Sequence, residues 1–237
     1  MIDLHTHILP GVDDGPTEIS VSLEMLRMQK RQGVDVVALT SHFYPTHQNP
    51  ECFCEKRQAS YESLLEAIEQ MPKEEQEKLP RMVLGAEVAF VPGLENLDYL
   101  EKLCYQGSSS ILLELPFTPW NQQMFRQLYH FTERTGLQPI LAHIDRYGNF
   151  QKKAHMQEIL EMDMPMQISC RAFTGMFFRS RALSMLCNLN AIPVSDCHGV
   201  SYRPPNMEKA MTIIRRNLGN KVQEIICRAE EVLDNGK

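Results

Sequence analysis

The sequence lacks an apolar run long enough to cross a bilayer, a basic and apolar leader, and a surplus of positive charge. A membrane-spanning helix needs roughly 18 apolar residues in succession, and no segment of the 237 residues provides them. Asp3, His5 and His7 occupy the start, where a secretory leader would be basic and then apolar. The net charge is -6, whereas nucleic acids are bound largely through Lys and Arg. We therefore expect a cytoplasmic protein that neither inserts into a membrane nor binds nucleic acid as its main partner.

A cysteine framework is also lacking. The seven cysteines are an odd number without regular spacing, and Cys52 and Cys54 form C-F-C, not the CxxC of a zinc or redox site. Disulfides persist mainly in oxidising compartments. We therefore expect reduced thiols, most of them small residues of the core.

Neither an internal repeat nor a low-complexity tract divides the chain, and the charged segment 71–81 is predicted to be an ordinary connection within one domain, residues 1–237. Short apolar runs predict seven buried parallel strands, at residues 1–4, 34–41, 82–90, 110–117, 138–144, 165–169 and 192–196. Amphipathic helices are predicted between them, among others at 17–33, 56–71, 119–136 and 179–190. The first helix is expected to be capped by Thr17 and to end at Gly33. Strands that alternate with helices in this way predict a parallel α/β barrel.

Side chains that a core would reject follow the predicted strands at their carboxyl ends, where α/β barrels carry their chemistry. The first strand is followed by His5 and His7. Because side chains alternate along a strand, these two histidines point in the same direction. The others are His42, Glu87, Glu114, His143, Asp196 and His198. One histidine at a strand end is more often a hydrogen-bonded structural residue, and a lone glutamate could pair with a lysine or cap a helix. Burying so many ionisable groups together costs several kcal/mol for each isolated charge unless cations compensate. The pattern therefore predicts a metal site.

The donor types restrict the metal. Imidazoles with carboxylates suit Zn, Mn or Fe. The candidate ligands exceed one coordination sphere, so we expect two or three divalent ions with a bridging carboxylate. On spacing, Asp13 and Asp14 are equal candidates for a further ligand, and D-D-G could also be a plain turn.

The arrangement of H-x-H after the first strand, an isolated histidine after the second and D-x-H after the last resembles the polymerase and histidinol phosphatase (PHP) superfamily. MIDLHTHILPGVDDG, the T-S-H at 40–42, GAEV at 85–88, AHIDRY at 142–147 and SDCHGVSYRPP at 195–205 further resemble the bacterial capsule-biosynthesis protein tyrosine phosphatases. The resemblance runs nearly end to end. It implies a distorted, TIM-like (β/α)7 barrel with parallel strands and a site of up to three metal ions, with Mn as the first candidate and Fe or Zn as alternatives.

The resemblance also implies roles for particular residues. It implies metal-binding roles for His5, His7, Asp14, His42, Glu87, Glu114, His143, Asp196 and His198. Arg146 and Arg203 match positions that the family uses near the phosphate, whose oxygens suit the forked donors of guanidinium; taken alone, each arginine could be a surface residue. The chain departs from the family at H-I-D-R-Y, where H-P-E-R-Y is usual, and at S-C-R-A (169–172), where a run of small residues is usual. These departures remove no ligand but alter the substrate pocket, where Arg171 would add positive charge at the rim.

The implied activity is that of a metal-dependent phosphomonoesterase that hydrolyses phosphotyrosine. A metal-activated hydroxide would attack phosphorus in line, and the implied partner is a phosphotyrosyl protein, the tyrosine-rich tail of a bacterial capsule or exopolysaccharide kinase. Two alternatives stay open. One is a small-molecule phosphatase on the same barrel, acting for instance on histidinol phosphate, and the other is a non-catalytic module that binds phosphotyrosine or metal.

A second phosphatase signature overlaps the last metal motif. Cys197 to Arg203 fit C-x5-R, the pattern of the unrelated cysteine-dependent tyrosine phosphatases. That route requires a thiolate of low pKa, which the neighbouring Asp196 would disfavour, so the metal route is the prediction. The histidines at 130 and 155 are predicted to be surface or packing residues. His47 is predicted to be a loop residue, with lining of the pocket as the alternative, and Trp120 is predicted to pack at the start of a helix, with a place beside the substrate as the alternative.

Overall fold

Parallel strands in two hydrogen-bonded sheets build the centre of the molecule. The structure is a computed structural model, and it describes residues 1–175 and 178–235. The first sheet has the order β1-β2-β4 and consists of β1 (Ile2–Thr6), β2 (Val36–Leu39) and β4 (Arg81–Leu84). The second has the order β3-β5-β6-β7-β8-β9 and consists of β3 (His42–Phe43), β5 (Glu87–Ala89), β6 (Ser110–Glu114), β7 (Gln138–Leu141), β8 (Met166–Ser169) and β9 (Ala191–Val194). Every pair of neighbouring strands is parallel.

The predicted α/β fold of parallel strands that alternate with helices is confirmed, and short breaks interrupt the chain after β2 and after β4. The predicted segment 34–41 contains β2, and β3 begins directly after it at His42; the predicted segment 82–90 contains β5 and all of β4 except its first residue, Arg81. The second break falls at Gly85, where a Cβ atom would lie 3.2 Å from side-chain atoms of Thr40 and Tyr105, so the close approach requires glycine. Beyond β9, the backbone N–H of Asp196 donates to the His5 carbonyl. This bond sets the last strand beside the first.

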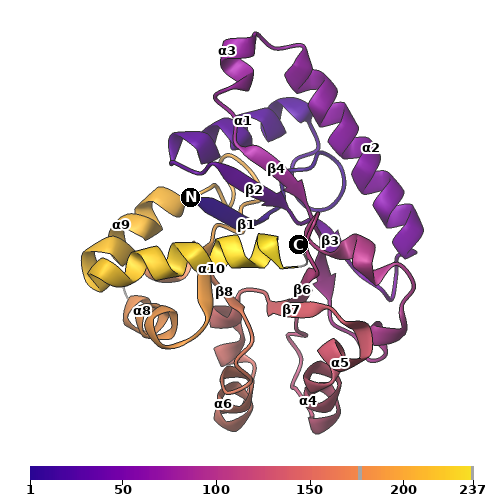
Figure 1. Cartoon of the computed structure of the whole chain (residues 1–237), viewed down its shortest axis with the longest axis vertical. Coiled ribbons are helices and arrows are strands. Elements are labelled where there is room, and N and C mark those ends of the chain that lie inside the picture. The colour runs from indigo at the N-terminus through magenta and orange to yellow at the C-terminus, as the bar shows by residue number, and fades with distance from the viewer. Residues whose placement is uncertain (176–177, 236–237) are drawn as a thin grey trace.

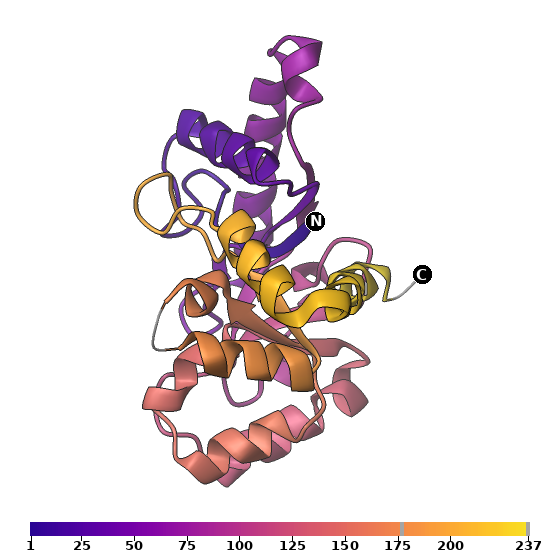
Figure 2. The same cartoon turned by 90° about the vertical axis from the view of Figure 1, so that its left-hand side faces the viewer.

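The helices lie outside the strands (Figures 1 and 2). They are α1 (Ile19–Arg31), α2 (Pro50–Glu69), α3 (Lys73–Gln76), α4 (Gln122–Tyr129), α5 (Phe131–Thr135), α6 (Lys153–Leu160), α7 (Cys170–Thr174), α8 (Arg179–Asn188), α9 (Met207–Leu218) and α10 (Val222–Asp234). Four short 3₁₀ helices, η1 (Leu94–Asn96), η2 (Leu100–Leu103), η3 (Ile144–Asn149) and η4 (Gly219–Lys221), complete the described elements.

Local capping explains where the helices differ from the sequence prediction. Helix α2 begins at Pro50 and not at residue 56, because the Asn49 side chain accepts hydrogen bonds from the first free backbone N–H groups and proline suits the first helical position. The predicted Thr17 cap is wrong: Glu18 precedes α1, and its side chain makes no capping bond. Gly33 follows α1 with φ of 79°, as expected for the residue that ends a helix. Segment 119–136 forms two helices, which divide at His130.

Helix α10 covers the amino ends of the strands. Ala229, Val232 and Leu233 pack with side chains of the strands in one buried apolar cluster. Just before β6, Ser108 donates its hydroxyl proton to the Val232 carbonyl, at 2.6 Å. Figure 1 shows α10 crossing in front of the strands. This end of the barrel is therefore closed, and the opposite end is left for chemistry.

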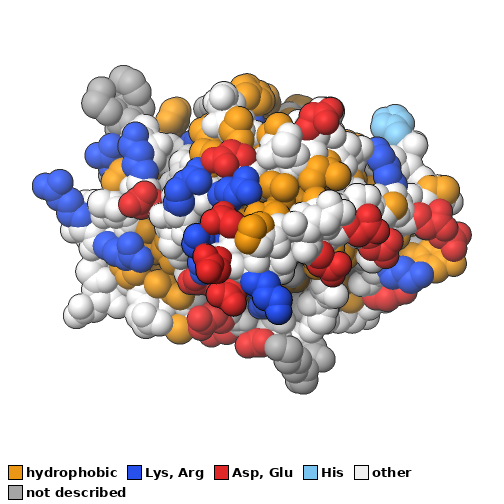
Figure 3. Space-filling view, turned by 90° about the horizontal axis from the view of Figure 1, so that it is seen from above, with side chains coloured by type: hydrophobic (Ala, Val, Ile, Leu, Met, Phe, Trp, Pro, Cys, Tyr) orange, Lys and Arg blue, Asp and Glu red, His pale blue; other side chains and the backbone are white. Residues whose placement is uncertain are grey.

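The outer surface carries charges of both signs. Viewed from the side of α3, basic and acidic side chains are interspersed with apolar ones (Figure 3). Across the described residues, no helix combines the length and hydropathy that a membrane span would need. Only Cys104, Cys170 and Cys197 of the seven cysteines are buried, so the prediction that most cysteines are core residues is wrong; several lie on helix faces that reach the surface.

The residues predicted to have loop, surface or packing roles are found in such positions. His130 is exposed between α4 and α5 and pairs with Glu133. His47 is exposed in the turn after β3. Trp120 is buried just before α4, where its indole N–H donates to the Pro116 carbonyl. Its predicted packing role is thereby confirmed.

Candidate metal centre

All nine side chains predicted as metal ligands lie in one cluster at the carboxyl ends of the strands. They are His5 on β1, His42 on β3, Glu87 on β5, Glu114 on β6, and His7, Asp14, His143, Asp196 and His198 in the segments that follow strands. Most are buried, whereas the Asp14 side chain is 61% exposed at the mouth. Parallel strands deliver their carboxyl ends to one edge, which explains why the distant segments meet. The ligand role of each residue stays a prediction.

Glu87 occupies the centre of the cluster. Its Oε2 atom lies 3.1 Å from His5 Nε2 and 3.2 Å from His7 Nε2. The same oxygen lies 3.1 Å from His42 Nδ1, and Oε1 lies 2.8 Å from His143 Nε2. One carboxylate thus faces four imidazoles, which is the placement expected of a bridging ligand.

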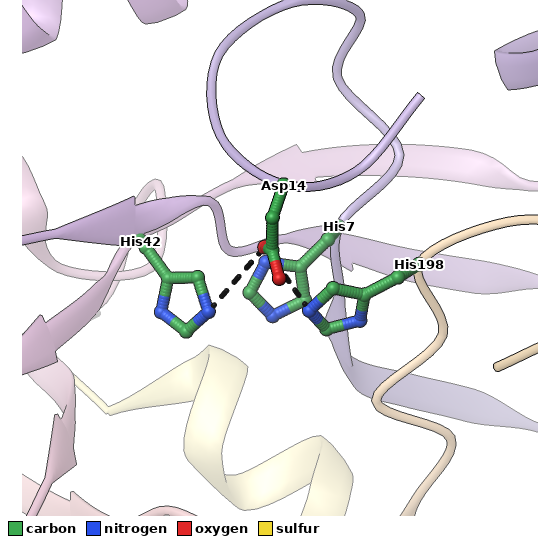
Figure 4. A group of neighbouring side chains, drawn as sticks. All are labelled: His7, Asp14, His42 and His198. Carbon is green, nitrogen blue, oxygen red and sulfur yellow. Dashed lines mark ion pairs between the residues drawn. The ribbon is translucent and has the colours of Figure 1, made fainter. Parts of the chain in front are cut away.

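A second group lies toward the mouth, where Asp14 reaches between two histidine rings (Figure 4). Its Oδ1 atom lies 3.3 Å from His198 Nε2 and 3.6 Å from His42 Nε2. The rings of His7 and His198 stack with centroids 3.8 Å apart. Together with His7, these three side chains place four candidate ligand atoms within 4.8 Å of one another.

The donor geometry fits metal ions better than a network of hydrogen bonds. The Nε2 atoms of His5 and His7 lie 3.1 Å apart and can share at most one proton. Asp196 Oδ1 is buried without a hydrogen-bond partner and lies 3.7 Å from both of these nitrogens, which is too far for a hydrogen bond. Ligand atoms about 2.1 Å from a common ion lie roughly 3–4 Å from one another. The separations around His5, His7, Glu87 and Asp196 therefore suit a cation between them.

Charge is strongly coupled within the cluster. Burial alone would raise the pKa of Glu87, but His5 and the other imidazoles hold that pKa well below its usual range. Burial alone would lower the pKa of His7, but Asp13 and Glu87 raise it to about 9. Burial, His7 and Arg203 lower the pKa of His198, which keeps that ring neutral and able to donate a lone pair. The carboxylates thus attract positive charge into the centre.

The structure distinguishes Asp13 from Asp14. The Asp13 side chain is buried, and its Oδ2 atom accepts a 2.7 Å hydrogen bond from His7 Nδ1 and a 2.9 Å bond from the His42 backbone N–H. Asp14 instead points at the outer faces of His42 and His198. Asp13 therefore orients a candidate ligand from behind, with the His7 Nε2 lone pair directed into the cluster, as carboxylates commonly do for metal-binding histidines.

Gln167 orients His5 in the same way, and it was not among the predicted site residues. It lies on β8, the one predicted strand without a candidate ligand. Its Nε2 atom donates to the Leu4 carbonyl and the Tyr105 hydroxyl, so its Oε1 atom is the acceptor that faces His5 Nδ1 at 2.7 Å. The His5 proton is thereby held on Nδ1, and its Nε2 lone pair faces Glu87. A search for charged residues alone could not find this neutral partner.

We expect Gln167→Met to weaken metal binding about 10- to 100-fold, the usual cost of losing the partner that orients a metal-binding histidine. Methionine has a similar volume but no strong acceptor for His5 Nδ1. Titration of metal into the metal-free variant, with the thermal unfolding midpoint measured in parallel, tests this expectation. Gln167→Glu restores an acceptor and should recover most of the affinity; equal affinity in all three proteins would contradict the role of Gln167.

The two predicted arginines reach the same centre. Arg146 and Arg203 both form ion pairs with Asp196 Oδ2, and the Arg203 contact measures 2.5 Å. Arg203 also donates from Nη1 to His198 Nε2, at 3.0 Å. His143, Asp196 and Arg203 have φ values of 30°, 51° and 49°, in the left-handed region that residues other than glycine seldom adopt. Such strain gathers at functional sites because surrounding contacts hold the residues in place.

The chain is similar to known proteins over nearly its whole length. Residues 1–233 match the family described as capsular polysaccharide synthesis, CpsB/CapC. The tyrosine-protein phosphatase CpsB of Streptococcus pneumoniae is 30% identical over 232 residues, which cover 93% of this chain and 92% of that protein. The tyrosine-protein phosphatase YwqE of Bacillus subtilis (strain 168) is 27% identical over 98% of this chain and 91% of its own length.

A solved structure has the same fold over the whole chain. It belongs to the crystal structures of YwqE from Bacillus subtilis and CpsB from Streptococcus pneumoniae, which are described as metal-dependent tyrosine phosphatases. The TM-score is 0.80 at 23% identity, and the match covers 100% of this chain and 96% of the other. This likeness supports the architecture described above.

Proposed function

Because the chain belongs to the capsular polysaccharide synthesis family CpsB/CapC, we propose that it is a metal-dependent protein-tyrosine phosphatase. The observation that carries this proposal is the convergence of nine candidate metal ligands beside Arg146 and Arg203, at the open end of the barrel. Relatives that align over most of both chains and are named tyrosine-protein phosphatases support the reaction class.

We infer a centre of two or three divalent ions, with Mn as the first candidate and Fe or Zn as alternatives. Three overlapping groups of donors support this number: His5, His7 and Glu87; His42, Glu87 and Glu114; and His7, Asp14, His42 and His198. They share residues, so ions held there would be close neighbours. When bound, such ions supply positive charge to phosphoryl oxygens and lower the pKa of a water molecule.

The two arginines would hold the phosphate. Both guanidinium groups now contact one oxygen of Asp196, and each retains further N–H donors. Non-bridging phosphoryl oxygens match this fork of donors. They would share with Asp196 the task of balancing the positive charge of the two guanidinium groups. The arginines would thus fix the orientation of the phosphoryl group during in-line attack.

Aromatic side chains at the mouth favour an aryl phosphate. Tyr44 stacks on His42, Phe117 stacks on His143, and each remains partly exposed. A phenyl ring between such surfaces buries apolar area that a short polar alcohol would leave uncovered. A phenolate also leaves phosphorus more readily than an alkoxide.

For the partner, we propose a phosphotyrosyl protein in the cytoplasm, namely the tyrosine-rich tail of a capsule or exopolysaccharide tyrosine kinase. The family description and the names of the relatives support a role in capsule synthesis.

We expect the metal-loaded protein to hydrolyse a phosphotyrosyl peptide with kcat/KM about 100-fold above that for histidinol phosphate, because in phosphotyrosine the phenyl ring is bonded directly to the phosphate oxygen and leaves as a phenolate, whereas histidinol phosphate is an alkyl phosphate. Phosphate release and the metal content should be measured on the same preparation. A variant with His5→Ala and His7→Ala serves as the background for contaminating phosphatases.

Two results would reject the proposal. A preference for histidinol phosphate would make the protein a small-molecule phosphatase. A metal-loaded protein that binds phosphotyrosine but turns over no phosphoester would make it a regulatory module.

A further inference from the structure

A second polar pocket adjoins the metal centre. It has a volume of about 480 Å³ and lies between η3, the β8–α7 junction, α8 and the loop that carries Tyr202. Arg146 and Arg203 form part of its lining, and both also contact Asp196 in the cluster. The pocket is therefore continuous with the candidate catalytic site.

Positive charge dominates this pocket. Its lining contains four arginines, Arg146, Arg171, Arg181 and Arg203, against the single carboxylate of Asp145. This concentration is unexpected in a protein with a net charge of -6. Guanidinium groups gathered around a concave surface are typical of sites that bind anions.

Two of these arginines have no anionic partner. Arg146 and Arg203 are paired with Asp196, whereas the side chains of Arg171 and Arg181 form no hydrogen bond or ion pair with any described residue. Arg181 nevertheless has a defined place: a Cβ atom on Gly148 would lie 2.9 Å from its Nη1 atom, so its guanidinium rests against η3. Burial and the charge of Arg203 lower the pKa of Arg171, which indicates that these two cations face the same space.

The floor of the pocket contains an unused hydrogen-bonding group. Ser169 is 2% exposed, and its hydroxyl has no partner among the described residues. Its backbone N–H donates to Asp145 Oδ1, at 2.8 Å, which directs that carboxylate toward the backbone. A buried hydroxyl without a partner is costly, and an anionic group that enters the pocket would accept its proton.

The rim suits a peptide side chain better than a small inorganic anion. Phe178 and Tyr202 are 59% and 76% exposed at the opening. A volume of 480 Å³ is within the range of pockets that hold organic ligands, about 300–1,000 Å³. Aromatic side chains beside arginines offer both apolar contact and charge to an occupant that carries a ring and an anionic group.

We propose that this pocket binds a second anionic side chain of the peptide substrate while the reacting phosphotyrosine occupies the metal centre. The inference rests on the proposed phosphatase function and adds a rule for substrate choice. The second group is a phosphotyrosine or an acidic residue near the reacting phosphotyrosine in the same chain. Arg171 and Arg181 supply the selectivity, because Arg146 and Arg203 also serve the first phosphate.

Peptides that differ at one neighbouring position test the proposal. Each carries one reacting phosphotyrosine, and a second position, varied from one to four residues away, is tyrosine, glutamate or phosphotyrosine. The proteins are the wild type, the double variant Arg171→Gln/Arg181→Gln, and the charge-matched control Arg215→Gln/Arg216→Gln, whose two arginines are exposed in the last turn of α9. The measurements are kcat/KM for each peptide, kcat/KM for p-nitrophenyl phosphate, and peptide affinity from fluorescence anisotropy.

For the wild type and the control, we expect kcat/KM about 10-fold higher when the second position is anionic than when it is tyrosine, the effect of one or two charge-assisted hydrogen bonds. In the double variant this preference should fall to about twofold or less, and the turnover of p-nitrophenyl phosphate, which has no second anionic group, corrects the comparison for any general change in activity. A larger effect of phosphotyrosine than of glutamate identifies phosphate as the preferred group, and equal effects identify anionic charge in general.

The pocket and the catalytic function can fail separately. Absence of a charge preference in an active wild type, or its survival in the double variant, would overturn the pocket and leave the phosphatase intact. If the wild type turned over no peptide but bound anionic peptides more tightly than the tyrosine peptide, and the double variant lost this difference in affinity, the pocket would be supported and the phosphatase function overturned.

Discussion

Replacing Glu87 by glutamine is expected to remove at least one metal ion from each chain and to lower kcat on a phosphotyrosyl peptide about a thousand-fold or more. The carboxylate is 1% exposed and faces four imidazoles, so no other described acidic residue is as well placed to bridge ions. Glutamine would turn either an N–H donor or a neutral oxygen toward the ions. The negative charge on the phosphoryl oxygens in the transition state would then lose much of its stabilisation, and in enzymes the loss of even one such stabilising donor commonly costs about 10²–10³ in rate.

The metal content and the rate should be measured on the same sample of the Glu87→Gln variant, with circular dichroism to verify the fold. Glu66→Gln is the matched control, because Glu66 is exposed on α2. That variant should keep the metal and rate of the wild type. If Glu87→Gln also kept both, the bridging role would be wrong, and with it the placement of the ions.

The chemistry of the site was readable from the sequence because a parallel barrel gathers the ends of its strands. His5, His7 and His42 follow apolar runs, and the alternation of side chains fixes the side to which they point. The D-x-H at 196–198 could be placed beside them by the same rule. The order of the strands and helices was therefore enough to predict that these side chains meet, without knowledge of how the elements pack.

The supporting residues could not be read in this way. Asp13 and Asp14 occupy one turn, and only the folded loop turns one carboxylate inward to His7 and the other outward to His198. Gln167 carries no charge, and its role depends on the contact between β8 and the end of β1. Such hydrogen bonds join residues that are distant in sequence and lack a periodic pattern.

Some predicted boundaries of strands and helices were wrong for a related reason. Apart from Glu87, segment 82–90 is one apolar run, but in the structure it is divided between Leu84 and Glu87 into two strands. The first turn of α2 has no apolar periodicity, although Asn49 followed by Pro50 is a recognisable start signal. Local capping chemistry was therefore present in the sequence, whereas the distortion of the barrel was not.

The cysteine signature at 197–203 is contradicted by its surroundings. Cys197 is fully buried, and burial raises the pKa of its thiol to about 12. Gln29 Nε2 lies 3.5 Å from its sulfur, and Arg203 is directed at Asp196 and His198 instead. The loop also leads into bends before α9 begins at Met207. A neutral thiol in this position cannot reach a phosphate at the mouth.

Metal removal and removal of this thiol should therefore have opposite outcomes. A chelator is expected to reduce phosphotyrosine hydrolysis to the background, a loss of about a thousand-fold or more, and added Mn should restore it. Cys197→Ala is expected to keep kcat within about threefold and to cost about 1 kcal/mol of stability, because it deletes one buried sulfur atom. Cys52→Ala, which alters an exposed thiol, is the control. A Cys197→Ala variant that kept its fold and metal but lost about a hundred-fold in rate would reinstate the thiolate as nucleophile, since no ion-based role of Cys197 predicts that loss.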